Sequence, residues 1–142
     1  MTDTPQHSVR VAGVVVREDG RILAVQRRDT AHWEPPGGIL ELDETFEDGV
    51  IREVAEETGI TVEVERLTGA YKNLTRGVVA LVFRCHPVDG TPTPTGESQR
   101  VHWLTRDEIT NRMAPAFAIR VLDALSDGAV FRAHDGVHLV AP

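Results

Sequence analysis

Residues 38–60 read GILELDETFEDGVIREVAEETGI and contain a well-marked helix signal. Thr45 and Asp48 have the spacing of a capping box, and Gly59 suits the left-handed position after a helix. The pattern therefore predicts a helix from about Thr45 to Thr58. One face of this helix is predicted to pack on a sheet, because apolar residues recur there at helical spacing. The members of that face are Val50, Ile51, Val54, Ala55 and Thr58.

The opposite face of the predicted helix carries three carboxylates. Glu53, Glu56 and Glu57 are related by three and four positions, so they fall within about a third of the helix circumference. Like charges at this spacing repel, and the helix dipole disfavours anions in the last turn. A solvated acidic face is the alternative for a helix standing alone. A hard cation such as Mg²⁺ explains the arrangement better, because it binds carboxylate oxygens. Arg52 can orient the Glu56 carboxylate four residues later.

Composition bounds the class of protein. The 142 residues fit one domain, expected over 1–142, and 41% hydrophobic with 26% charged residues is ordinary for a globular chain. A formal net charge of −7 disfavours a nucleic-acid polymer as partner. No apolar run approaches the ~20 residues of a membrane span, and residues 1–10 are polar, so we expect no membrane partner and a cytoplasmic location. Cys85, the only cysteine, is expected to be buried.

Before the helix, the sequence predicts two strands and a loop. Val9 to Val16 is rich in β-branched residues, and Asp19-Gly20 is a turn signal ahead of Arg21 to Arg27, so a hairpin is predicted. His32 to Gly38 contains two prolines and two glycines. This segment is predicted to be an irregular loop of defined shape.

After the helix, the sequence predicts three strands, two short helices and a terminal hairpin. The strands are expected at Ile60 to Leu67, Val78 to Cys85 and Arg100 to Leu104, with a flexible stretch at Lys72 to Gly77 and a surface loop at Pro87 to Gly96. Thr105 and Glu108 match a capping box, and Pro115 suits the first turn of a second helix ending near Gly128. The tail from Ala129 to Val140 is predicted to turn at Asp135-Gly136.

The spacing within residues 38–60 matches every fixed position of the Nudix box. It runs Gly38, five residues, Glu44, seven residues, Arg52-Glu53-Val54, one residue, Glu56-Glu57, one residue, Gly59-Ile60. Trp33, Pro36-Gly37-Gly38 and Glu41 resemble the loop that precedes the box, and Glu97 with Val101 to Leu104 resembles a later strand. The chain therefore resembles the Nudix hydrolase family over most of its length. The resemblance implies an α/β fold, an α/β/α sandwich around a mixed β-sheet.

The resemblance also implies roles for particular residues. It implies that Glu53, Glu56 and Glu57 bind a metal, with the Gly38 carbonyl as a further ligand and Mg²⁺ or Mn²⁺ as the ion. The resemblance implies that Glu44 supports the loop, with a contact to a metal as a further role. The general base varies across the family, and Glu56 or Glu53 is expected here, with Glu97 as a further carboxylate.

The resemblance therefore implies hydrolysis of a diphosphate linkage in a small nucleotide-like substrate. A bound metal activates a water that attacks phosphorus, and Arg27 or, with slight preference, Arg28 can hold phosphate oxygens; solvated strand-end arginines are the alternative. We expect a nucleoside triphosphate to be cut to monophosphate and pyrophosphate. ADP-ribose or a nucleotide sugar is an alternative substrate, and a non-catalytic nucleotide-binding module is an alternative function. A homodimer is compatible with the resemblance, but no interface signal is visible.

The base pocket lies outside the box, so the sequence says little about it. Four aromatic side chains are candidates for stacking on a base, with positions in the core as the alternative. They are Trp33, Tyr71, Phe83 and Trp103.

Overall fold

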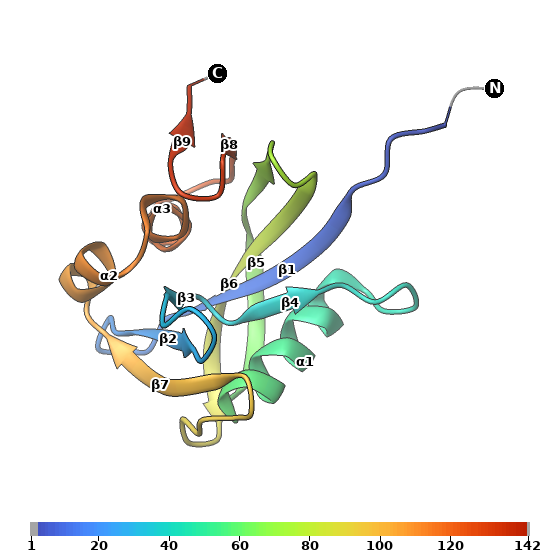
Figure 1. Ribbon diagram of the computed structural model, residues 1–142. Helices are drawn as coiled ribbons and strands as arrows, with labels where there is room; N and C mark the ends of the chain where they lie inside the picture. Colours follow the sequence, from blue (N-terminus) through green and yellow to red (C-terminus); the bar gives the residue numbers. More distant parts are fainter. Residues whose placement is uncertain (1–2, 142) are drawn as a thin grey trace.

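Two β-sheets and three helices make up the part of the chain that the structure describes, residues 3–141 of the computed structural model (Figure 1). The ends of the expected 1–142 unit, Met1, Thr2 and Pro142, lie outside the described residues. The elements are β1 (Ser8–Val15), β2 (Ile22–Arg27), β3 (Trp33–Glu34), β4 (Gly37–Ile39), α1 (Phe46–Thr58), β5 (Thr61–Asn73), β6 (Val78–Asp89), β7 (Ser98–Leu104), α2 (Arg106–Arg112), α3 (Pro115–Ala124), β8 (Val130–His134) and β9 (Leu139–Val140).

The larger sheet is mixed, which confirms the expected α/β class. Its six strands follow the order β4-β1-β6-β5-β8-β9. β1 runs parallel to β6 and β5 runs parallel to β8, whereas the other neighbours are antiparallel. The smaller sheet is antiparallel, in the order β3-β2-β7. No helix within residues 3–141 is long and apolar enough to cross a membrane.

Strand β1 is buried on both faces because helices cover both sides of the larger sheet. Val11 and Val15 belong to the buried cluster that contains the apolar face of α1. Ala12 and Val14 point the other way, into the cluster that contains the apolar face of α3. In Figure 1, α1 and α3 accordingly lie on opposite sides of β1 and β6. A strand that is buried on both faces needs a continuous apolar run, which explains the composition of this segment.

The helix predicted from residues 38–60 is confirmed as α1, with one error on its buried face. The Thr45 hydroxyl accepts a hydrogen bond from the Asp48 N–H at 3.1 Å, and Gly59 takes a left-handed φ of 76°. Val54 is fully buried, but Ala55 is exposed rather than packed on the sheet. The buried stripe follows positions 50, 54 and 58, four residues apart, and Gly49 completes it on the side away from Ala55.

The predicted hairpin between the first two strands is wrong. A turn does form, with Gly20 at a φ of 86°, but β1 joins the larger sheet and β2 the smaller one. Only a bridge between Val16 and Ile22 connects the two segments. The two strands separate because β1 is paired along its length with β6 and β2 with β7.

Other boundaries differ where strands extend into segments predicted to be loops. The segment His32 to Gly38 is not wholly irregular, since β3 and the start of β4 flank its two prolines. Pairing with β6 carries β5 through Lys72 to Asn73, and β6 itself continues to Asp89. The last helix, α3, ends at Ala124, before Gly128.

Several local predictions are confirmed. Thr105 and Glu108 form a reciprocal capping box at the start of α2. Pro115 opens α3, and β8 pairs with β9 across the expected turn. Cys85 is buried, and burial raises the pKa of its thiol to about 12, which leaves it protonated at neutral pH.

We expect Val54→Ala to lower the free energy of unfolding by about 2 kcal/mol, because it empties space at a fully buried side chain. Ala55→Gln is expected to change it by less than about 0.5 kcal/mol, since Ala55 faces solvent. Urea unfolding followed by circular dichroism measures both. A large loss in Ala55→Gln would contradict the observed packing of α1.

Candidate active site

An open cleft of about 710 Å³ lies between α1, the start of β4 and the end of β2. It gathers most of the residues that the sequence singled out, although they come from distant parts of the chain. The predicted residues that line it are Arg27, Arg28, Gly38, Arg52, Glu53, Glu56, Glu57 and Glu97. Glu44 does not line the cleft and lies behind Arg52.

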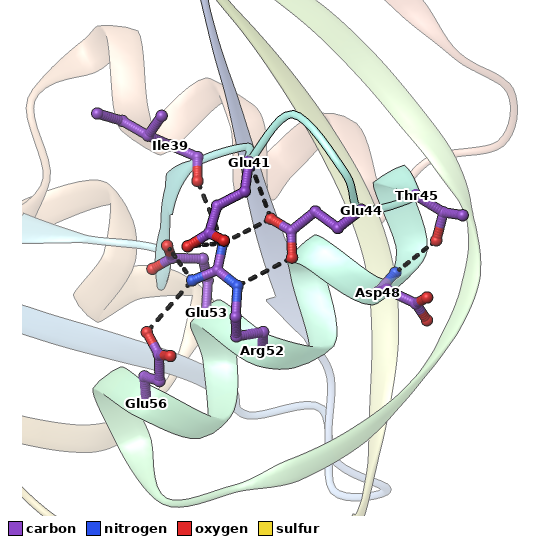
Figure 2. Close-up of polar contacts among 8 residues, drawn as sticks. All are labelled: Ile39, Glu41, Glu44, Thr45, Asp48, Arg52, Glu53 and Glu56. Atoms are coloured by element: carbon purple, nitrogen blue, oxygen red, sulfur yellow. Dashed lines mark hydrogen bonds and ion pairs between the residues drawn. The ribbon is translucent and has the colours of Figure 1, made fainter.

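Arg52 is the centre of a polar network on α1 (Figure 2). It donates two hydrogen bonds to the Glu44 carboxylate, from Nε at 2.9 Å and from Nη2 at 2.6 Å. Its Nη1 donates to Glu53 at 2.9 Å and to Glu56 at 3.3 Å, and Nη2 also reaches the Ile39 carbonyl at 3.2 Å. The predicted contact with Glu56 is therefore present. The stronger partner is Glu44, because a two-bond pair with a carboxylate uses the fork of the guanidinium.

Glu44 fixes the loop between β4 and α1. Its Oε1 accepts the Glu41 N–H at 2.9 Å in addition to its bonds from Arg52. These hydrogen bonds, from Arg52 and then from Glu41, hold the pKa of Glu44 at about 2. The carboxylate is thus ionised and already occupied by protein donors, which suits a residue that positions others.

The remaining carboxylates crowd negative charge into the cleft. Burial is the main cause that raises the pKa of Glu57 to about 8, and the negative charge of the neighbouring Glu53 acts in the same direction. A hydrogen bond from the Gly37 backbone only partly offsets this rise. Burial also raises the pKa of Glu53, against the effect of Arg52. Ionising both groups is unfavourable unless a cation is close. Glu56 is more open, with 62% of its side chain exposed.

The donor set fits a divalent cation. Carboxylate and carbonyl oxygens are the ligands that Mg²⁺ and Mn²⁺ prefer. A Cβ at position 38 would displace the Glu53 carboxylate, so glycine lets the backbone and this carboxylate lie close together. Within residues 3–141, no three acidic, histidine or cysteine side chains are already gathered closely enough to hold a metal. Because Arg52 engages an oxygen of Glu53 and of Glu56, a cation would have to compete with it.

The opposite wall of the cleft is basic. Arg27 pairs with Asp29 through two hydrogen bonds of 2.9 and 2.8 Å. Arg28 donates to the carbonyls of Gly96 and Thr95, at 3.1 and 3.3 Å. These bonds hold the loop that carries Glu97, so the later carboxylate enters the same cleft.

Sequence reasoning missed Arg10, which also lines the cleft. It lies on β1 opposite Ile39 of β4, and it forms no salt bridge with any residue from 3 to 141. The position depends on the pairing of β1 with β4. No local sequence signal could have revealed it.

None of the four aromatic candidates for stacking lines this cleft, and three of them are core side chains. Trp33, Tyr71 and Phe83 are each at most 8% exposed. Tyr71 donates its hydroxyl hydrogen bond to Asp123 at 2.7 Å. Trp103 is partly buried, beneath the guanidinium of Arg17.

Comparisons with known proteins agree with this geometry. The chain matches the family model described as the NUDIX domain over residues 6–125. It is 63% identical over 140 residues to a "MutT-like protein" of Streptomyces ambofaciens, covering 98% of this chain and 91% of that protein. It is 31% identical over 103 residues to the "Oxidized purine nucleoside triphosphate hydrolase" of Mus musculus, covering 68% of this chain and 65% of that protein.

A solved structure shares the fold. The crystal structure of an ADP-ribose pyrophosphatase from Streptococcus suis superposes with a TM-score of 0.76 at 23% identity, covering 91% of this chain and all of that one. Members of the NUDIX family generally use divalent metals and act on small nucleotide diphosphates. The family match spans most of the chain, and one relative is 63% identical over nearly its whole length. The chain therefore belongs to the Nudix family and is a Nudix pyrophosphohydrolase.

Proposed function

We propose that this Nudix hydrolase converts a nucleoside triphosphate to the monophosphate and pyrophosphate. The observation that carries the proposal is a single cleft in which the carboxylates of α1 face arginines from β1 and from the end of β2. Carboxylates can hold cations, and arginines can hold phosphate oxygens. The mouse relative is named for hydrolysis of purine nucleoside triphosphates, which supports this substrate class. The likeness to the ADP-ribose pyrophosphatase supports the fold alone.

The carboxylates of α1 are proposed to form the metal site. Glu53, Glu56 and Glu57 would hold Mg²⁺ or Mn²⁺ together with the Gly38 carbonyl. The bound cation supplies charge withdrawal from phosphorus and a lowered pKa for the attacking water. Arg52 positions the ligands Glu53 and Glu56 through the contacts described above, and Glu44, on its other side, holds Arg52 in place.

The cleavage step uses the remaining groups of the cleft. Glu56 or Glu53 accepts the proton of the attacking water, while the water oxygen bonds to a phosphorus of the α–β linkage. The bond from that phosphorus to the bridging oxygen breaks, and its electron pair leaves with the departing phosphate group. Arg28, Arg27 and Arg10 hold the phosphate oxygens in place.

Replacing single carboxylates of α1 tests their roles. We expect Glu53→Gln, Glu56→Gln and Glu57→Gln each to lower kcat by about 10²–10⁴-fold, because each removes a metal ligand or the base. Glu47→Gln is the matched control, since Glu47 lies in the first turn of α1 and outside the cleft. Turnover at the wild-type rate in Glu56→Gln and Glu53→Gln would rule out both as the base.

The Glu44–Arg52 pair is expected to act through the metal ligands. Arg52→Lys cannot reproduce the two-bond contact, so the Mg²⁺ concentration for half-maximal activity should rise about 10–100-fold. Glu44→Gln should also raise the Mg²⁺ concentration for half-maximal activity. The double variant should add little to either single one, because both break one contact. A loss of kcat with unchanged Mg²⁺ dependence would instead place Arg52 on the substrate.

Product analysis tests the reaction itself. We expect a chelator to abolish turnover and added Mg²⁺ to restore it, with monophosphate and pyrophosphate as the only products from a triphosphate. Chromatography of reactions with nucleoside triphosphates, ADP-ribose and nucleotide sugars measures this. Release of inorganic phosphate, or turnover of ADP-ribose alone, would overturn the proposed substrate class.

A further inference from the structure

A second cavity of about 570 Å³ continues from the catalytic cleft. The two share Arg10, Arg27 and Asp29 as lining residues. The second cavity extends between α3, the facing ends of β5 and β6, and the turn after β8. A nucleotide whose phosphates lie in the cleft can therefore place its base here.

Arg120, on α3, is a buried cation in the wall of this cavity. It is only 7% exposed, although it lines the space. Its guanidinium lies 4.6 Å from the ring centroid of Phe117 and 5.1 Å from that of Tyr71. Aromatic rings therefore cover it, as in cation–π pairs, and only its N–H donors remain to bind a polar group.

One of these donors lacks an acceptor. Nε is buried without a hydrogen-bond partner, and no salt bridge within residues 3–141 includes Arg120. Burial lowers its pKa only to about 10, so the side chain is charged at neutral pH. A buried donor without an acceptor is costly, which favours a ligand that supplies one.

The one hydrogen-bond partner of Arg120 among residues 3–141 is already engaged. Nη2 lies 3.3 Å from Nε2 of His134, whose Nδ1 lies 3.0 Å from the Gly136 N–H. Burial is the main cause that lowers the pKa of His134, and the positive charge of Arg120 acts in the same direction. The ring is therefore neutral at neutral pH. A neutral imidazole has a single acceptor nitrogen, and it cannot serve both N–H groups. His134 therefore leaves either Arg120 or Gly136 unpaired.

The ligand must offer acceptors to Arg120 in a cavity whose wall carries charges of both signs. Glu34, Asp29 and Asp135 line the cavity, as do Arg10, Arg27 and Arg76. A neutral base with acceptors on one edge and donors on another suits both kinds of side chain. Guanine and hypoxanthine present O6 and N7 side by side, the pair that arginine binds with two hydrogen bonds. Their N1–H can donate to a carboxylate such as Glu34. Adenine presents an amino donor in place of O6.

We propose that the second cavity selects 6-oxopurine nucleotides and that Arg120 is the residue that reads O6 and N7. The inference rests on the proposed function for the placement of the phosphates. It assigns to this chain a preference for guanine or hypoxanthine over adenine nucleotides.

Binding of uncleavable nucleotides tests this selection separately from turnover. Isothermal titration with the α,β-methylene analogues of GTP and ATP, in Mg²⁺, should show the GTP analogue bound about 10–100-fold more tightly. Arg120→Met, which keeps length but removes the donors, should bring the two affinities within about threefold. Arg17→Met is the matched control, because Arg17 also lies over an aromatic ring but outside both cavities. It should keep the full preference.

Two affinity measurements on the wild-type protein test the same claim without relying on a variant that could misfold. Guanosine monophosphate should bind the wild-type protein more tightly than 2-aminoadenosine monophosphate, in which an amino group replaces O6. Equal affinities in this pair, or a preference for guanine that survives in folded Arg120→Met, would overturn the assignment. Hydrolysis of GTP and ATP at equal kcat/KM would refute the base preference and leave the proposed reaction intact. Selective binding without any turnover would refute the reaction instead.

Discussion

Arg52 and Glu44 form a two-bond ion pair that ties the loop after β4 to the middle of α1. The same guanidinium reaches Glu53, Glu56 and the Ile39 carbonyl, so the loop and two carboxylates of the helix share one cation. Only arginine offers enough donors in a fixed plane for this set of contacts. Without it, the acidic face of α1 would repel itself and the loop carrying Gly38 would lose its anchor.

The placement of Gly38 and Arg10 in the cleft depends on where β1 lies. Its pairing with β4 sets Val11 opposite Gly38 and Arg10 opposite Ile39. A Cβ at Gly37 would clash with the Val11 carbonyl, so this glycine allows the close approach. The acidic wall on α1 and the position of Arg10 on β1 are therefore fixed by one strand pair and one ion pair.

Features that depend on neighbouring residues were predictable from the sequence, and those that depend on distant ones were not. The caps of α1 and the acidic face follow from helical spacing alone. Ala55 was misplaced because burial depends on how the helix lies over the sheet. The first hairpin was wrong because the partner of β1 is β6, more than sixty residues later. Arg10 and Arg120 carry no local signal, since only sheet pairing and the packing of α3 bring them to the cavities.

The central claim is that the carboxylates of α1 hold a divalent cation in the cleft. Electron paramagnetic resonance of Mn²⁺ tests it directly, because the free ion has a strong signal that weakens on binding. The wild-type protein should reduce that signal, and the folded Glu53→Gln, Glu56→Gln, Glu57→Gln triple variant should leave it unchanged. Equal Mn²⁺ binding by the two proteins would contradict the account and place the metal elsewhere.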